Sequence, residues 1–175
     1  IYVSTFDGHI YSLSPDDGSL LPWVFKSDVG FVSAPVFSHG IVAVGLFDNS
    51  LCAVKAGGSA PEWSFLGDSW FWAAPVVEDG IVYAACLDGK IYALNAETGE
   101  MVWEFDSQEP IVASPVCEGD LLLVVNESGN MYVFDTNARP ADKNMKPIKT
   151  ISVEAEVKGA LCVHEGIVYV RGQNN

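Results

Sequence analysis

The chain has 175 residues, and 49% of them are apolar, which is enough to bury a sizeable core and excludes a disordered tail. It carries 9 Lys and Arg residues against 23 Asp and Glu residues, a formal net charge of -14. A field of this sign repels phosphate groups, so nucleic acid is not expected as a partner. No apolar run approaches the roughly 18 residues of a membrane span, so we expect no direct membrane insertion of this segment.

An internal repeat of about forty residues organises the sequence. A proline followed by valine marks each repeat, at Pro35, Pro75 and Pro115. A tryptophan recurs at the same step, at Trp23, Trp63 and Trp103. The repeat divides the chain into a partial unit over about 1–25, full units over 26–65, 66–105 and 106–151, and a partial unit over 152–175.

The unit 66–105 shows the expected strands most clearly. Its β-rich runs, each bounded by turn residues, cover Phe71–Val77, Gly80–Cys86, Lys90–Asn95 and Met101–Phe105. The pair Asp88-Gly89 suits a two-residue hairpin between the second and third runs, and Gly99 suits the next turn. No stretch combines helical length with a 3.6-residue apolar period, so each unit is predicted to be an antiparallel meander of four strands.

The second strand of each unit indicates how the units pack. It is apolar at every position in Ile81–Ala85 and in Leu121–Val125, so both faces of its sheet are predicted to be covered. The repeated prolines lie in the first strand, which is then an edge strand because proline cannot donate to the ladder. Sheets stacked face to face around a channel form a β-propeller, which explains the strict period better than a β-sandwich does.

We therefore predict an all-β fold, a β-propeller of four-stranded antiparallel blades, with about four blades in this chain. Tyr2-Val3 and Ile167–Tyr169 both occupy the second-strand position, so the first and last units compete for one place instead of sharing a blade. We expect an open arc that is part of a larger ring, with the other blades supplied by the same protein or by a second chain.

The residues from Leu87 to Phe105, which read LDGKIYALNAETGEMVWEF, resemble the PQQ-like propeller repeat. That repeat occurs in quinoprotein alcohol dehydrogenases, in BamB-like envelope lipoproteins and in sensor domains, typically in rings of seven or eight blades. The resemblance implies an extracytoplasmic location, in the periplasm or at the cell surface. It also implies that the strand-four tryptophans Trp23, Trp63 and Trp103 dock between neighbouring blades. The fourth unit departs from the pattern, because Asn137–Lys149 replaces the turn and the tryptophan.

The sequence shows no catalytic constellation. Its histidine, serine and acidic residues match no nucleophile, phosphate-loop or zinc-protease motif. The quinoprotein dehydrogenases of this family carry adjacent cysteines at the cofactor, whereas no two cysteines are adjacent here. We predict no cofactor, no metal site and free, buried thiols, with the redox compartment left open, at Cys52, Cys86, Cys117 and Cys162.

Two features are candidate binding sites. Trp70 and Trp72, at the start of an innermost strand, are more aromatic than the aligned residues of the other units and are candidate ligand-binding residues at the channel. The alternative is that these rings pack on each other or fill an oversized channel. The basic cluster of the fourth unit is a candidate partner contact, or else a solvated loop, and comprises Arg139, Lys143, Lys146 and Lys149.

A strong fold signal without a chemical constellation favours a noncatalytic module. We predict a scaffold for protein interaction, or a ligand-binding and sensing module, in the cell envelope, with a protein partner or a small ligand at the channel. Two alternatives remain, a fragment of a PQQ-dependent quinoprotein dehydrogenase and the sensor propeller of a membrane kinase.

Overall fold

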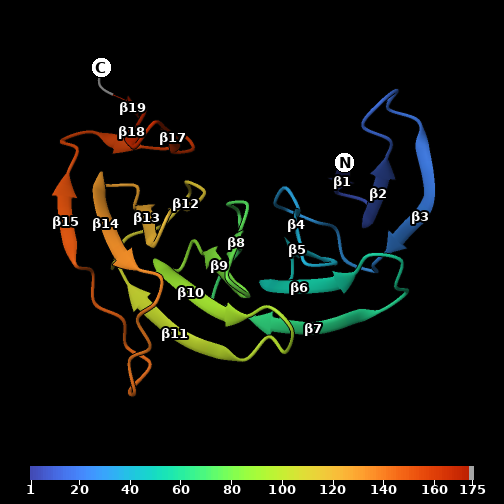
Figure 1. Ribbon diagram of the computed structural model, residues 1–175, viewed down its shortest axis with the longest axis horizontal. Coiled ribbons are helices and arrows are strands. Elements are labelled where there is room, and N and C mark those ends of the chain that lie inside the picture. Colours follow the sequence, from blue (N-terminus) through green and yellow to red (C-terminus); the bar gives the residue numbers. More distant parts are fainter. Residues whose placement is uncertain (174–175) are drawn as a thin grey trace.

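The structure is a computed structural model that describes residues 1–173. Within that range it contains β-strands and no helix, so it has no helix long and apolar enough to cross a membrane. The strands form successive antiparallel sheets that follow one another along an arc (Figure 1). The prediction of an all-β fold with four-stranded antiparallel blades is confirmed.

The sheets follow the order of the chain. The first has three strands, β1 (Tyr2–Ser4), β2 (His9–Leu13) and β3 (Leu20–Lys26). The second contains β4 (Val36–Ser38), β5 (Ile41–Gly45), β6 (Ser50–Lys55) and β7 (Pro61–Leu66). The third contains β8 (Val76–Glu78), β9 (Ile81–Ala85), β10 (Lys90–Asn95) and β11 (Met101–Asp106). The fourth contains β12 (Val116–Glu118), β13 (Leu121–Val125), β14 (Asn130–Asp135) and β15 (Lys149–Ser152).

The last unit is built differently from the others. Cys162–His164 (β17) pairs with Ile167–Tyr169 (β18), as the first two strands of a blade do. Two further strands of two residues each, Glu156–Val157 (β16) and Gly172–Gln173 (β19), pair with each other. The sequence did not indicate this second pair. Of the expected unit 152–175, Asn174 and Asn175 lie outside the described residues.

Apolar side chains of the second strands fill the space between blades. In β9, Val82 and Ala84 belong to the cluster shared with the second blade, whereas Tyr83 and Ala85 belong to the cluster shared with the fourth. Alternate residues of a strand point to opposite faces, so an uninterrupted apolar strand buries both faces of its sheet. This is the packing that the sequence pattern predicts.

The first strand of each blade is shorter than predicted. The expected strand Phe71–Val77 is reduced to β8, which begins at Val76, directly after Pro75. The prolines therefore precede the innermost strands and do not lie within them. The residues before the proline leave the sheet because they cross from one blade to the next, where Phe71 is fully buried.

The long connection of the fourth blade is tied to the third blade, although most of its residues are exposed. It returns along the outer edge of β11, where Asn144 forms a parallel bridge with Glu104. The Glu104 backbone N–H donates to the Lys143 carbonyl at 2.9 Å, and the Met145 N–H donates to the Glu104 carbonyl at 2.8 Å. Met145 is buried in the cluster between the third and fourth blades. We call residues 142–146 the clasp, because they join the fourth blade to the third.

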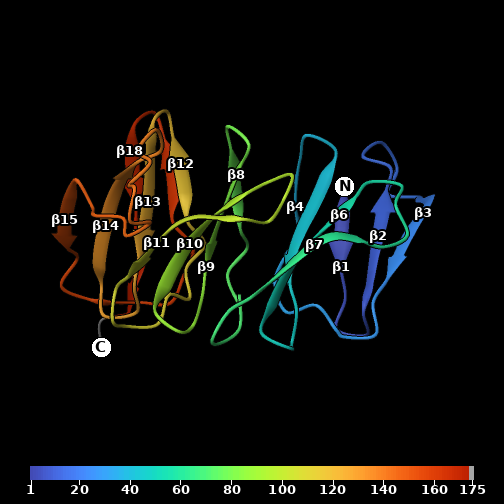
Figure 2. The same ribbon diagram turned by 90° about the horizontal axis from the view of Figure 1, so that it is seen from below.

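The blades follow an open arc. Figures 1 and 2 both place β3 at one end of the molecule and β15 and β18 toward the other. The first-strand edges β4, β8 and β12 line the inner side of the arc, and β7 and β11 lie on its outer side (Figure 1). The number of blades in a complete ring remains a prediction.

Candidate functional site

The connection between β7 and β8 carries both candidate tryptophans. Its anchor is Phe71, which is fully buried, whereas Trp70 and Trp72 on either side of it are exposed. Gly45 makes room for this anchor, since a Cβ there would lie 2.3 Å from the Phe71 carbonyl oxygen. An extended chain that buries its central residue must turn the two neighbours away from the core. Burial of Phe71 therefore determines that Trp70 and Trp72 reach the surface.

Both neighbouring blades hold this connection in place. The Gly67 N–H donates to the carbonyl of Asn49 in the second blade at 3.0 Å, and the Leu87 N–H of the third blade donates to the Trp70 carbonyl at 3.0 Å. The Asp68 N–H donates to the Asp88 carboxylate at 3.3 Å. Trp70 is thus displayed on backbone fixed at both ends, which lowers the entropy cost of using it for binding.

Trp70 lies on the second blade and not on Trp72. Its indole N–H donates to the Phe47 carbonyl at 3.0 Å, and its ring meets the Phe47 ring edge-on, with centroids 5.4 Å apart. Phe47 in turn contacts Phe6 of the first blade, with centroids 5.6 Å apart. We call these three residues, Phe6, Phe47 and Trp70, the aromatic strip.

The aromatic strip is exposed as well as continuous. Phe6 is 74% exposed, Phe47 37% and Trp70 38%. Phe47 and Trp70 lie in the second blade and in its connection to the third, with blades of this chain on both sides. Their exposure is therefore a property of one end of the blades and not of the chain termini.

Sequence reasoning missed Phe6 and Phe47, although the repeat contains the signal for them. Both precede the turn between the second and third strands, as the pairs Phe6-Asp7 and Phe47-Asp48. The third blade has Leu87-Asp88 at this position. Equivalent positions in successive blades lie side by side on the same end of a propeller, so a repeated apolar residue produces a row.

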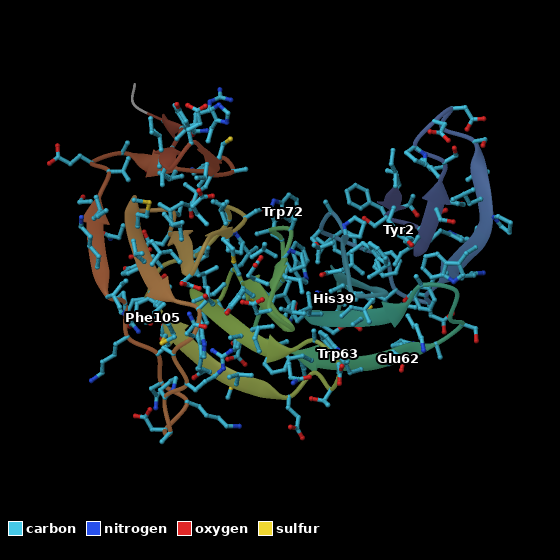
Figure 3. All side chains as sticks on the ribbon, viewed as in Figure 1. Tyr2, His39, Glu62, Trp63, Trp72 and Phe105 are labelled. Carbon is cyan, nitrogen blue, oxygen red and sulfur yellow. The ribbon has the colours of Figure 1, made fainter. Side chains whose placement is uncertain are left out.

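Trp72 occupies a different place from the strip. It is 48% exposed, and Figure 3 shows it on the inner side of the arc, beside β8. The prediction that it starts an innermost strand is wrong, because both Trp70 and Trp72 precede β8. Trp72 lies on the inner side of the arc, and its role in ligand binding remains a proposal.

Carboxylates accompany the strip. The Asp48 carboxylate accepts hydrogen bonds from the Ser50 N–H at 3.0 Å and hydroxyl at 2.6 Å, and Asp88 accepts from the Lys90 N–H at 2.9 Å and the Tyr92 hydroxyl at 2.7 Å. Burial, followed by the hydrogen bond to Asp88, raises the pKa of the Tyr92 phenol. The phenol therefore stays protonated and continues to donate to the carboxylate.

The repeated tryptophans of the fourth strands lie between blades. Trp63 is 8% exposed, and its indole N–H donates to the Ala96 carbonyl of the next blade at 2.8 Å (Figure 3). Gly99 lies against its ring, where an added Cβ would come within 2.7 Å of the indole. Trp23 is half-buried and donates in the same way to the Gly58 carbonyl at 2.8 Å. Each tryptophan thus meets the turn between the third and fourth strands of the following blade.

Trp103 departs from this scheme. It is fully buried against Tyr83 and Phe134, but its indole N–H has no partner, and neither has the buried hydroxyl of Thr136. The acceptor equivalent to Ala96 is the Thr136 carbonyl, and it accepts instead from the Arg139 guanidinium at 2.6 Å. The changed turn of the fourth blade has therefore kept the packing of the tryptophan and lost its hydrogen bond.

The four basic candidates of the fourth blade do not share one role. Arg139 also donates to the Ala138 carbonyl at 2.9 Å, so its guanidinium is occupied by backbone. Lys143 lies in the clasp, with a positive φ of 59°. Lys149 begins β15. Lys143, Lys146 and Lys149 are exposed, and their part in partner contact remains a proposal.

The cysteines are free, but not all are buried. Cys52 and Cys86 are buried, Cys117 is half-buried and Cys162 is exposed. Burial raises the pKa of each of the first three thiols to about 12. The prediction of buried thiols is therefore wrong for Cys162 and only partly met at Cys117. Within residues 1–173, no group of three or more His, Cys, Asp or Glu side chains is placed to hold a metal ion.

Comparisons with known proteins agree with this architecture. Residues 60–142 match the family model described as "Outer membrane protein assembly factor BamB". Among solved structures, BamB from Moraxella catarrhalis superposes with a TM-score of 0.82 at 17% sequence identity, covering 98% of this chain and 51% of that one. A comparison with curated proteins gives no match.

Two other propeller-like matches are similar in extent. The computationally designed Ika8 protein has a TM-score of 0.77 at 18% identity, covering 97% of this chain and 51% of the design. A chain of the mitotic checkpoint complex has a TM-score of 0.79 at 13% identity, covering 98% of this chain and 55% of that one. The chain thus spans about half the length of each of these three structures. Together with the repeats, these matches show that the chain has the β-propeller fold, with residues 60–142 similar to the BamB family model.

Proposed function

We propose that this chain is part of a noncatalytic protein-interaction platform outside the cytoplasm, and that a protein partner docks on the aromatic strip. The exposure of the strip carries this proposal. Aromatic side chains are enriched at the energetic centres of protein interfaces, and a contiguous exposed group of them is uncommon on a surface that faces water alone.

The local construction of the strip supports a binding role. Phe71 anchors the connection in the core, and Trp70 donates its only indole hydrogen to a backbone carbonyl. The rings are therefore held in position before a partner arrives. A rigid scaffold that displays connections at one end of its blades suits docking better than chemistry, which needs converging acid, base or nucleophilic groups.

The extracytoplasmic location is proposed from the family match. The matching model is described as an outer membrane protein assembly factor, and a position in the cell envelope follows if this chain shares that setting. A small ligand at the channel beside Trp72 is compatible with the same scaffold, but nothing beyond the exposure of that ring supports it.

Photo-crosslinking in the cell of origin tests the docking surface. A benzophenone amino acid replaces Phe47 in one variant and Leu121 in another, since these residues are 37% and 39% exposed and lie at opposite ends of their blades. We expect one defined adduct from position 47, identified by mass spectrometry and re-formed with the purified partner, and lost when Trp70→Ala is added. Equal adducts from both positions, or none from position 47, would refute the proposal.

A further inference from the structure

The chemistry around the aromatic strip identifies the class of segment that docks on it. This inference rests on the proposed function and adds the charge of the partner. Each of the first three blades places an aspartate directly after the apolar residue that precedes the turn, as Phe6-Asp7, Phe47-Asp48 and Leu87-Asp88. Apolar and carboxylate groups therefore alternate along this end of the blades.

The turns fix these carboxylates in place. Asp7 accepts from the Thr5 hydroxyl, and that hydrogen bond holds its pKa below the usual value. Asp48 and Asp88 are held by Ser50 and by the Lys90 backbone in the same way. Fixed carboxylates form a preorganised negative surface, because they need not be ordered when a cation arrives.

Local cations leave most of this charge uncompensated. In the first three blades the basic side chains at this end are Lys26, at the end of β3, Lys90, at the start of β10, and His9, whose imidazole lies 3.3 Å from the Asp7 carboxylate and carries charge only when protonated. The Lys90 ammonium is committed to the Glu104 carboxylate at 3.4 Å. The aspartates here are Asp7, Asp48, Asp68 and Asp88. An excess of carboxylates therefore borders the aromatic strip, in a chain whose net charge is already -14.

Aromatic faces beside carboxylates bind cationic side chains well. A guanidinium stacks on the ring of Trp or Phe while its N–H groups donate to a neighbouring carboxylate, and an ammonium gains the same cation–π attraction. Phe47 contacts both other rings, with its centroid 5.6 Å from that of Phe6 and 5.4 Å from that of Trp70, so the strip is about as long as three residues of extended chain. We infer that the aromatic strip binds an extended segment of a partner protein that carries arginine or lysine between apolar residues.

Short capped peptides supply the probe. One peptide of eight residues alternates leucine with arginine, and its control replaces each arginine with citrulline, which keeps the shape and removes the charge. Binding to the whole chain is followed by the indole N–H resonances of the five tryptophans. We expect the Trp70 resonance to shift with the arginine peptide, with at least about tenfold weaker affinity for the citrulline peptide and a similar loss in high salt.

Variants of the protein locate the interaction. Asp68→Asn combined with Asp48→Asn should weaken the arginine peptide about tenfold and leave the citrulline peptide unchanged. Asparagine at position 48 can still accept from Ser50, and the hydrogen bond of residue 68 to Asp88 is made by its backbone N–H. Asp79→Asn, in an exposed turn at the opposite end of the third blade, is the matched control and should change neither. Trp70→Phe should retain binding, and Trp70→Ala should lose it.

The outcomes separate this inference from the proposed function. Equal affinity for the arginine and citrulline peptides, with crosslinking at position 47 intact, would overturn the cationic partner and leave the platform standing as a surface for a neutral ligand. Loss of crosslinking at position 47 would refute the platform itself. A peptide effect that Asp79→Asn removes as strongly as Asp68→Asn would mean nonspecific attraction by net charge and would also overturn the inference.

Discussion

Replacing Trp63 and Trp103 separately with phenylalanine tests how the blades are joined. Trp63 is the less buried of the two, but its indole N–H donates to the Ala96 carbonyl, whereas the fully buried Trp103 N–H has no partner. Phenylalanine keeps an aromatic ring and removes the donor. If burial alone decided stability, Trp103→Phe would be the more damaging change.

The hydrogen bonds predict the opposite order. Both substitutions lose ring volume between blades, a cost of about 1–3 kcal/mol that is similar at the two sites. Trp63→Phe also removes a hydrogen bond and leaves the Ala96 carbonyl unpaired, which adds about 1–3 kcal/mol. Trp103→Phe instead removes a buried donor that has no acceptor, and that relief offsets part of the lost packing. We expect Trp63→Phe to be the more destabilising by about 2 kcal/mol.

Denaturant unfolding measures this difference. Far-ultraviolet circular dichroism follows the unfolding of the whole chain in both variants. The comparison uses variants whose unfolding slopes match that of the parent, because stacked repeats can unfold in more than one step. An equal cost at both positions, or a larger one for Trp103→Phe, would refute the role assigned to the Ala96 carbonyl.

Three further predictions concern packing and the thiols. Gly99→Ala should cost about 2–4 kcal/mol, because its Cβ would strike the Trp63 ring, whereas Gly80→Ala, also at positive φ but in open space, should cost about 1 kcal/mol, both measured by urea unfolding. At pH 8 a thiol reagent should modify Cys162 rapidly and Cys52 only on unfolding, as read by mass spectrometry. The pKa of Cys52 is about 12 in the folded chain and 9.0 ordinarily, so the unfolded chain releases the thiol proton first as pH rises. The free energy of unfolding should therefore fall between pH 9.0 and about 12, and it should fall less steeply in Cys52→Ala.

Most of the fold could be predicted from the repeat in the sequence. Turn pairs, recurring tryptophans and uninterrupted apolar strands predict stacked four-stranded sheets, because each feature depends on local geometry or on burial of both faces. The strands β10 and β11 accordingly begin at the predicted residues Lys90 and Met101. The innermost strands were overestimated, since the apolar character of Phe71 reflects burial between blades and not pairing in a sheet.

The sequence predicted only part of the candidate site. Trp70 and Trp72 stand out because their unit is more aromatic than the others, but the contact of Trp70 with Phe47 joins segments from neighbouring blades. Periodicity does not specify such a pair until the blades are placed side by side. The clasp was equally hidden, because its hydrogen bonds with Glu104 are made by backbone groups that any residue type provides.

The clasp also explains how the fourth blade can lack the standard turn and still pack against the third blade. The fourth blade lacks the glycine that receives a tryptophan, but Met145 fills the same buried cluster as Trp103, and two backbone hydrogen bonds to Glu104 tie the loop to β11. These contacts lie at the turn between the third and fourth strands. The aromatic strip lies at the turn between the second and third strands, which is the other end of the blade. The clasp is therefore made by the turn opposite the aromatic strip, while the Glu104 side chain pairs with Lys90 at the strip's end of the third blade.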